Sequence, residues 1–280
     1  MKTKQHRMKN LFLFLFLLVV FTSKAQDNRV SGLNSRQFTK YWKVESESPD
    51  YKVTFQGDTA EIVSPKGLTL WRKEKMSGKV TIEYDACVVV ESDGDRLSDL
   101  NCFWMASDPQ YPDNLWKREK WRSGIFLNCY SLQLYYLGYG GNHNSTTRFR
   151  RYDGDESGIT NPKARPAILK EYTDAGHLLK PNHWYHIKIT NENNRVSYYI
   201  DGERLVDFRD AEPLREGWFG FRTTLSRTRI TNFSYECSSQ EATAVPLQWI
   251  GETPRQDKAV SFGVPFDKGE VFPENSSIIC

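Results

Sequence analysis

The stretch YYLGYGGNHNSTTRFRRY, residues 135–152, has the pattern of a β-hairpin and is the most informative part of the chain. Two alternating runs flank a glycine-rich turn that carries His143 between two asparagines. The return strand places Arg148, Arg150 and Tyr152 on one face. Arginine offers a planar fork of donors to a carboxylate or sulfate. The hairpin therefore predicts a pocket for an anionic, hydroxyl-rich ligand, such as an acidic sugar.

Short alternating runs separated by turn residues continue on both sides of this hairpin. From Tyr51 onward there is almost no helical periodicity, which favours an all-β protein. The spacing predicts an antiparallel β-sandwich or jelly roll. The run at residues 80–90 is the longest strand candidate and belongs in the middle of a sheet. Further strands are expected at residues 100–106, 125–130, 184–189, 196–200 and 204–208.

Other strands supply further candidates for ligand binding. Asn101 and Trp104 lie on opposite faces of the strand at 100–106, and the sequence does not say which face meets a ligand. Arg222 reaches the cleft if Phe219 and Phe221 enter the core. Arg122 opens the strand expected at 125–130, directly after residues 109–121, which are predicted to be a loop or short helix at the sheet rim.

The N-terminus has the pattern of a secretory signal peptide. Residues 1–25 combine a charged start, a short apolar block and a small-residue cleavage site ending at Ala25. The 38 Lys+Arg of the chain include five in this leader, so the mature chain has 33 against 35 Asp+Glu, a net charge of −2. This predicts a periplasmic or secreted protein that is not held in a membrane after cleavage, with no electrostatic case for nucleic acid.

Nothing in the sequence requires a cofactor or a catalytic metal. The five cysteines show no metal-ligand spacing, and buried free thiols are at least as expected as disulfides. Structural calcium is left open at two acidic turns, residues 93–95 and 153–155. We therefore expect no cofactor other than such a calcium ion.

Several motifs resemble a known family. Residues 83–86, the hairpin at 198–208 and the run from Gly220 to Phe233 resemble the concanavalin A-like jelly rolls of bacterial polysaccharide-degrading enzymes. The hairpin with Gly138–Asn142 and Thr147–Tyr152 is similar to a domain of Bacteroidetes proteins, most specifically the ulvan oligosaccharide dehydratases and related polysaccharide lyase-like proteins. The resemblance spans residues 38–237 and implies a concave sheet that holds a sugar.

The C-terminal part carries a separate resemblance. Residues 245–251 and 260–266 resemble the opening of the exo-acting rhamnogalacturonan lyase module. The expected organisation is a signal peptide at 1–25, a catalytic jelly roll at 26–240 and a linker or module remnant at 241–280. This association also implies acidic, pectin-like or ulvan-like substrates.

The implied chemistry is β-elimination from a uronic acid. The substrate carboxylate must be neutralised before the C5 proton can be removed, and Arg148, Arg150 and Arg222 are expected to do this. His143 is expected as base or acid, with Tyr139 or Tyr152 as its counterpart. Asn142, Asn101, Trp104 and Arg122 are expected to contribute binding.

The expected reaction is dehydration that forms a 4,5-unsaturated uronate at the non-reducing end. The alternatives are a polysaccharide lyase, a glycoside hydrolase and a noncatalytic carbohydrate-binding module. A retaining hydrolase needs two carboxylates close together, and no Glu-x-Asp-x-x-Glu strand is present. Which sugar is bound, and whether water or a glycoside leaves, stay open at this stage.

Overall fold

The computed structural model describes residues 30–238 as an antiparallel β-sandwich with short helices in its loops. This confirms the predicted fold class. The strands that begin the chain are β1 (Val30–Ser31), β2 (Trp42–Ser46), β3 (Lys52–Gln56), β4 (Thr59–Arg72), β5 (Met76–Ser77) and β6 (Lys79–Val88). Those that follow are β7 (Leu100–Ser107), β8 (Gln133–Gly140), β9 (Thr146–Asp153), β10 (Lys170–Tyr172), β11 (Tyr185–Glu192), β12 (Arg195–Ile200), β13 (Glu203–Arg209) and β14 (Glu216–Ser238).

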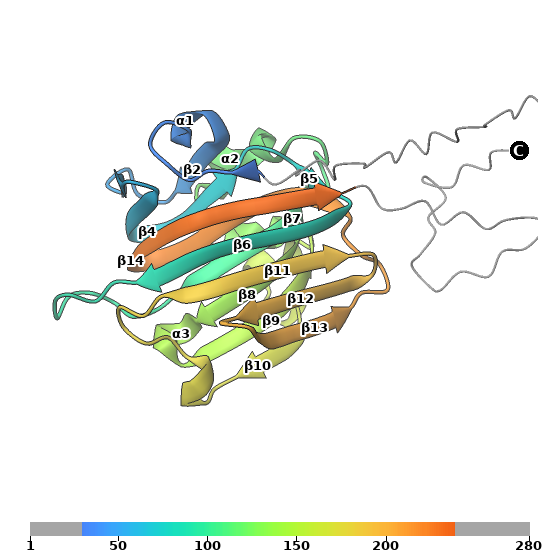
Figure 1. Cartoon of the computed structure of the whole chain (residues 1–280). Coiled ribbons are helices and arrows are strands. Elements are labelled where there is room, and N and C mark those ends of the chain that lie inside the picture. Colours follow the sequence, from blue (N-terminus) through green and yellow to red (C-terminus); the bar gives the residue numbers. More distant parts are fainter. Residues whose placement is uncertain (1–29, 239–280) are drawn as a thin grey trace, which may run out of the picture.

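Two long strands belong to both layers of the sandwich. The first part of β14 pairs with β7 and with residues 68–71 of β4, whereas its later part pairs with β6 and with residues 60–64 of β4. The front sheet is therefore β10-β9-β8-β7-β14-β4-β2, and the back sheet is β3-β4-β14-β6-β11-β12-β13. Figure 1 views the molecule from the side of the back sheet. Its strands β6, β11, β12 and β13 are nearest the viewer, and β7, β8 and β9 of the front sheet lie beyond them.

Aromatic side chains fill the space between the two sheets. Tyr84 of the back sheet meets Phe221 of the front sheet edge to face, with ring centroids 4.9 Å apart. The ring centroids of Trp104 on β7 and Tyr198 on β12 are 6.1 Å apart. Such pairs contribute beyond their buried apolar area. The inner faces of both sheets therefore form the main core, and ligand-binding side chains must come from other faces.

A second apolar cluster lies on the outer face of the front sheet. The segment from Leu115 to Leu132 covers this part of the sheet and contains η1 (Leu115–Arg118), α2 (Glu119–Arg122) and η2 (Leu127–Ser131). Cys129 and Tyr130 of η2 pack there with Phe103 and Trp71. The prediction of a strand at 125–130 is wrong, because left-handed residues Ser123 and Gly124 turn the chain and the following run coils down onto the sheet.

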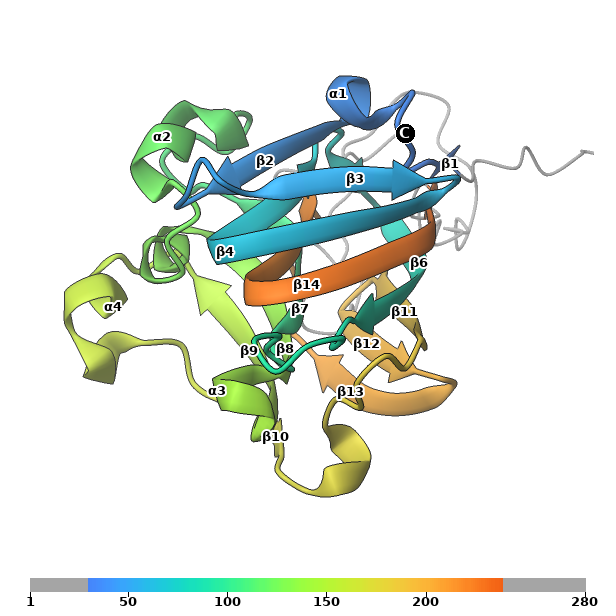
Figure 2. The same cartoon turned by 90° about the vertical axis from the view of Figure 1, so that its left-hand side faces the viewer.

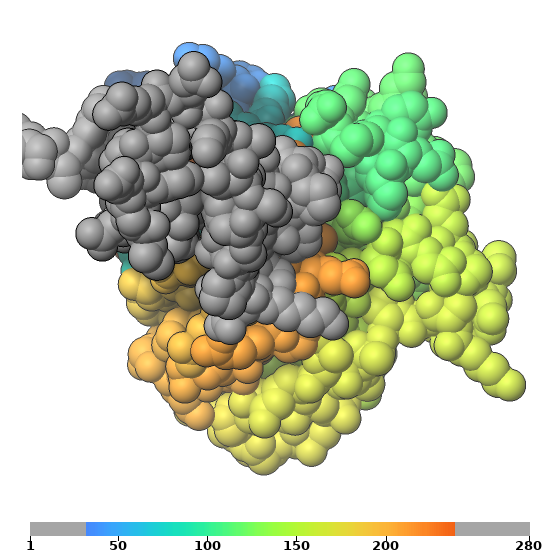
Figure 3. Space-filling view, turned by 90° about the vertical axis from the view of Figure 1, so that its right-hand side faces the viewer, coloured from blue at the N-terminus to red at the C-terminus, as the bar shows by residue number. Residues whose placement is uncertain are grey.

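The remaining helices are α1 (Phe38–Tyr41), α3 (Gly141–Asn144), α4 (Ser157–Thr160), η3 (Pro162–Ala164) and η4 (Ala175–His177). Figure 2 shows α2, α4 and α3 along one side of the molecule, with α2 near β2 and α3 near β9. In Figure 3, the segment around β13 lies beside that around β10, where Tyr172 donates a hydrogen bond of 2.7 Å to the Leu205 carbonyl. No helix within residues 30–238 is long and apolar enough to cross a bilayer.

Candidate functional site

A cleft of about 450 Å³ opens on the outer face of the front sheet, beyond the part covered by η2. We call it the arginine cleft, because five arginines line it. Its charged and histidine lining residues are Glu47, Arg96, Asp99, His143, Arg148, Arg150, Arg165 and Arg222. The other lining residues are Asn101, Phe126, Leu127, Tyr130, Tyr136, Gly138, Gly141, Asn142, Thr146 and Thr224.

Strand register explains why residues far apart in sequence meet in this cleft. Arg222 of β14 lies opposite Asn101 of β7, Asn101 lies opposite Gly138 of β8, and Gly138 lies opposite Arg148 of β9. This row crosses three strand spacings, about 14 Å in all at ~4.8 Å per spacing. Its two arginines can therefore meet different groups of one extended ligand.

A parallel row places Arg150 beside a tyrosine. Arg150 of β9 lies opposite Tyr136 of β8, which lies opposite Phe103 of β7. Arg150 and Tyr136 both line the cleft, whereas Phe103 is fully buried. The two rows together define the floor of the site.

Three of the five arginines donate hydrogen bonds only to backbone or hydroxyl oxygens in the part of the chain that the structure describes. Arg222 donates to the Gly124 carbonyl at 2.6 Å, Arg150 donates to the Pro166 carbonyl, and Arg165 donates to the Gly158 carbonyl at 3.3 Å. Arg222 is also 97% buried, at a relative exposure of 3%. No carboxylate among residues 30–238 forms an ion pair with these three guanidinium groups. Their charge is thus available to an anionic ligand.

The other two arginines already have carboxylate partners. The Arg96 Nη1 atom lies 2.6 Å from Asp99 Oδ2, and the Arg148 Nε atom lies 2.5 Å from Oε1 of Glu171 on β10. Counting side chains that line the cleft, five arginines face Glu47 and Asp99, a net charge of +3 with His143 neutral. A partly enclosed positive site of this kind favours anions.

Tyr136 is a cleft residue that the sequence reasoning missed. Its pKa is raised by burial and further by Asp99, while Arg222 and Arg150 oppose the rise. The phenol is therefore protonated at neutral pH and can donate a proton. The signal was present, because Tyr136 alternates with Gly138 on the face of β8 that meets Arg148 and Arg150.

The turn between β8 and β9 carries His143 at the rim of the cleft. Asn142, His143 and Asn144 all have left-handed backbone conformations, with φ between 52° and 58°. Asn144 anchors the turn by accepting from the Leu179 N–H at 2.8 Å and donating to the Leu179 carbonyl at 2.9 Å. Asn142 donates to the Thr146 hydroxyl at 3.2 Å. The His143 side chain is exposed and has no hydrogen-bond partner within residues 30–238.

The structure brings together six of the ten predicted site residues: Asn101, Asn142, His143, Arg148, Arg150 and Arg222. Their chemical roles stay predictions. Asn101 donates to Asp99 at 3.1 Å, and its buried Oδ1 has no donor in the described range. Buried polar atoms without a partner are uncommon, so this oxygen is a candidate hydrogen-bond acceptor at the cleft floor.

The other four predicted residues, Trp104, Arg122, Tyr139 and Tyr152, lie outside the cleft. Trp104 and Tyr139 point into the core between the sheets, because they alternate with Phe103 and Gly138, which face outward. Tyr152 shares a face with Arg150, but η2 covers it completely. Arg122 is fully buried in an ion pair of 3.0 Å with Glu45. None of these four lines the cleft.

At the two acidic turns proposed for calcium, carboxylates accept hydrogen bonds from neighbouring residues, and calcium binding there stays a prediction. Asp95 accepts hydrogen bonds from the backbone of Glu91 and Ser92, and Asp155 accepts from Ser157. Within residues 30–238, no three His, Cys, Asp or Glu side chains are grouped so as to hold a metal ion.

Fold and site together define a galectin-like β-sandwich with a cationic cleft on one sheet. The chain belongs to the family described as a domain of unknown function (DUF6250), whose model matches residues 62–233. Residues 243–280, outside the described range, match a PcRGLX-like N-terminal RIFT barrel domain. No curated protein matches the sequence.

Solved structures support the fold. A Bacillus subtilis protein of unknown function with a galectin-like fold has a TM-score of 0.59 and 16% identity, covering 76% of this chain and 96% of that chain. The exoplasmic/lumenal domain of VIP36, in a Ca²⁺/mannose-bound form, has a TM-score of 0.51 and 10% identity, covering 81% and 99%. At such identities the likeness establishes the fold alone.

Proposed function

We propose that this protein is a carbohydrate-active enzyme that binds a uronic-acid-containing oligosaccharide in the arginine cleft and acts on it by β-elimination. The observation that carries the proposal is the presence of Arg150, Arg165 and Arg222 in one cleft without carboxylate partners among the described residues. A guanidinium group that no carboxylate contacts directly can form strong hydrogen bonds with an anionic ligand.

The cleft residues fit the steps of such an elimination. Arg222 and Arg150 bind the uronate carboxylate, which makes the C5 proton more acidic. His143 removes that proton, because a neutral imidazole has one ring nitrogen that can accept a proton. The C5–H and C4–O bonds break, a C4–C5 double bond forms, and Tyr136 gives its proton to the departing oxygen. Burial raises the pKa of Tyr136, so the phenol carries its proton at neutral pH, and the negative charge that develops on the departing oxygen as the C4–O bond breaks favours transfer of that proton.

Dehydration is the specific reaction proposed, with loss of the C4 hydroxyl as water from a non-reducing-end uronate. Loss of a glycosidic oxygen would use the same residues and give a polysaccharide lyase. The motif resemblance to ulvan oligosaccharide dehydratases and the match of residues 243–280 to a PcRGLX-like module support an acidic polysaccharide as the source of substrate. The VIP36 domain, solved with mannose, supports a saccharide ligand for this type of sandwich.

A noncatalytic binding module is the second candidate. It is favoured by the position of His143, which is exposed at the rim without a residue among 30–238 to orient its ring. A hydrolase is less well supported, because Asp99 is occupied by Arg96, Ser98 and Asn101 and only Glu47 is left as a cleft carboxylate.

The test combines ultraviolet absorbance with mass spectrometry. Purified protein is mixed with oligosaccharides from ulvan and from pectin, and the absorbance of the unsaturated uronate is followed. The proposal predicts a rise in absorbance and a product lighter by one water. Shorter unsaturated products would identify a lyase instead. Binding without any change in absorbance or mass would identify a module. Shorter saturated products, whose masses sum to that of the substrate plus one water, would identify a hydrolase.

The proposed function also includes export of the protein from the cytoplasm. We propose that the leader is removed after Ala25 and that the protein acts in the periplasm or outside the cell, where long polysaccharides are first degraded. N-terminal sequencing of the protein purified from its native cells tests this. An N-terminus at Gln26 is the expected result, and retention of residues 1–25 would contradict it.

A further inference from the structure

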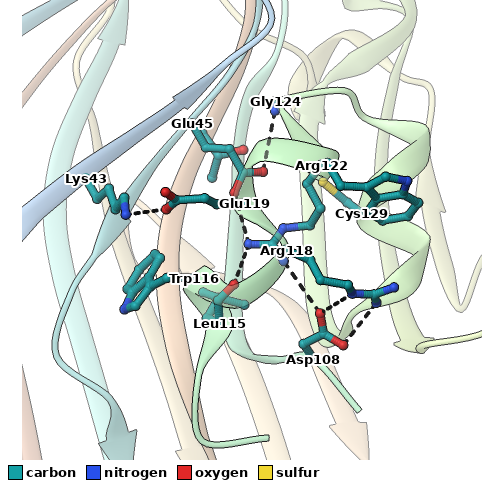
Figure 4. Close-up of polar contacts among 12 residues, drawn as sticks. Lys43, Glu45, Asp108, Leu115, Trp116, Arg118, Glu119, Arg122, Gly124 and Cys129 are labelled. Carbon is teal, nitrogen blue, oxygen red and sulfur yellow. Dashed lines mark hydrogen bonds and ion pairs between the residues drawn. The ribbon is translucent and has the colours of Figure 1, made fainter. Parts of the chain in front are cut away.

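A cluster of charged side chains, drawn in Figure 4, lies next to Gly124, whose carbonyl binds Arg222 of the arginine cleft. Arg122 is fully buried, and its Nη2 lies 3.0 Å from Glu45 Oε2, while its Nη1 lies 3.7 Å from Asp108 Oδ2. Asp108 also accepts two hydrogen bonds from Arg118, at 2.7 Å and 3.0 Å. None of these four side chains lines the cleft.

Gly124 connects this cluster to the cleft. Its N–H donates to Glu45 Oε1 at 3.4 Å, and its carbonyl accepts from Arg222 Nη1 at 2.6 Å. Arg222 faces the cleft, whereas Glu45 belongs to the buried cluster. A single glycine thus lies between the ion pair and the arginine that is proposed to meet the ligand.

The position of Gly124 is tightly constrained. Its φ is +70°, which glycine adopts readily and other residues rarely do. A Cβ at this position would lie 2.7 Å from the Ser46 Cα and 2.8 Å from the Glu47 nitrogen and the Gly67 oxygen. These are backbone atoms, which cannot move aside as a flexible side chain can. The backbone around β2 and β4 therefore leaves no room for a side chain at position 124 and restricts movement of Gly124.

We propose that Glu45 and Gly124 are positioning residues that hold the Arg222 guanidinium toward the arginine cleft. Glu45 fixes Gly124 from behind, Arg122 supplies the counter-charge that Glu45 needs, and the Gly124 carbonyl orients Arg222. An arginine held in place before binding loses less conformational entropy when an anion arrives. The importance of this arrangement for binding rests on the proposed function, whereas the orientation of Arg222 does not.

A buried ion pair contributes little net free energy to the stability of a loop. Desolvation of two charges offsets much of their attraction, and apolar residues of similar size often stabilise a fold equally well. A carboxylate is nevertheless a stronger acceptor for a backbone N–H than a neutral group. The cluster is thus better explained by a need for fixed geometry than by stability alone.

The first test needs no ligand. The side-chain N–H signals of Arg222, assigned by comparison with the Arg222→Lys variant, are recorded by NMR in the wild type and in Glu45→Gln. The proposal predicts slowly exchanging signals in the wild type that broaden or exchange at least about tenfold faster in Glu45→Gln, as expected when a hydrogen bond to a charged group is weakened. Glu61→Gln is the matched control, because Glu61 pairs with Arg227 and Arg229 on β14 outside the cleft.

The double variant Glu45→Gln/Arg122→Met covers the case in which Glu45→Gln alone fails to fold. It removes both buried charges and so leaves no uncompensated arginine. Thermal denaturation confirms that the protein is folded. Unchanged Arg222 signals in a folded variant without Glu45 would overturn the proposal.

The second test measures coupling with trigalacturonate as the probe. Glu45→Gln is expected to weaken binding roughly tenfold, within the range for residues of one network, and to have no further effect in an Arg222→Ala background. Equal weakening in both backgrounds would overturn the positioning role. Absence of any uronate binding by the wild type would instead count against the proposed function and leave the NMR result to decide the role of Glu45.

Discussion

Gly138 lies two residues after Tyr136 on the same face of β8, and a Cβ at Gly138 would overlap the Tyr136 hydroxyl. The phenol therefore lies over the glycine, in the gap between Asn101 and Arg148 in the row that crosses the cleft. The missing side chain at 138 makes room for the proton donor of the proposed reaction.

Gly138→Ala is predicted to abolish most elimination activity. The added methyl group displaces the Tyr136 ring from the cleft floor, and a small misplacement of a catalytic group can cost about 100-fold in rate. The rate is measured by the absorbance of the unsaturated product. Gly94→Ala is the control, since its new Cβ would come no closer than 4.0 Å to the Ser92 hydroxyl. Full activity of Gly138→Ala would argue against a role for Tyr136.

Two tyrosine variants test whether Tyr136 in the cleft or the covered Tyr152 is the proton donor. Tyr136→Phe is predicted to lower turnover by about 10²–10⁴-fold, the usual contribution of a general acid, while binding is retained. Tyr152→Phe is predicted to leave turnover unchanged. The Tyr152 hydroxyl is buried without a partner in the described part of the chain, so its removal is expected to maintain or raise the melting temperature. The opposite order of activities would assign the acid role to Tyr152.

The arginines are predicted to contribute unequally to binding. Arg222→Gln and Arg150→Gln are each expected to cost about 1.5–3 kcal/mol of binding free energy for an oligouronate, because each removes a charged donor. Arg148→Gln is expected to cost less, because Arg148 is already paired with Glu171. Calorimetric titration of the three variants checks this ranking. Equal losses at all three positions would contradict it.

The segment behind the His143 turn is predicted to be pH-sensitive. Burial lowers the pKa of His177, but hydrogen bonds to Asp174 and Glu203 outweigh this and raise it overall. A raised histidine pKa means that the stabilisation is complete below the unfolded value, near ~6.5, and is lost as pH rises through the folded value. The His177 carbonyl accepts from Thr147 of β9 at 2.6 Å, so this segment supports the hairpin that carries His143.

Hydrogen exchange of residues 173–180 measures this effect. Protection is expected to fall between mildly acidic and mildly alkaline pH in the wild type, and to be nearly constant in His177→Gln. His183→Gln is the matched control, because His183 lies 3.7 Å from its carboxylate, Asp201, and does not bridge two acids. An identical pH dependence in the wild type and His177→Gln would exclude His177 as its source.

Much of the fold could be predicted from alternation alone. The strands at 80–90, 100–106 and 184–208 were predicted because turn residues separate runs of period two, and β6, β7, β11, β12 and β13 lie there. The segment at 125–130 could not be predicted in the same way. Cys129 and Tyr130 are buried because η2 packs onto the sheet, and Phe126 and Leu127 pack against the same cluster, so a short helix here is as apolar as a strand.

The candidate site could likewise be predicted only in part from the sequence. Alternation placed Arg148 and Arg150 on one face, and the register of distant strands then added Asn101 and Arg222. It could not reveal which part of that face is covered, so Tyr152 was assigned to the ligand although η2 buries it. Nor could it show that Arg122 faces Glu45, a contact between residues 77 positions apart.

An acidic oligosaccharide is expected to bind in the arginine cleft. A crystal structure of Tyr136→Phe with a bound oligouronate tests it most directly, because this variant is expected to bind without turnover. The predicted result is a ligand carboxylate held by Arg222 and Arg150, with C5 facing His143. A ligand bound on the back sheet, or in the cleft with its carboxylate turned away from both arginines, would contradict the account.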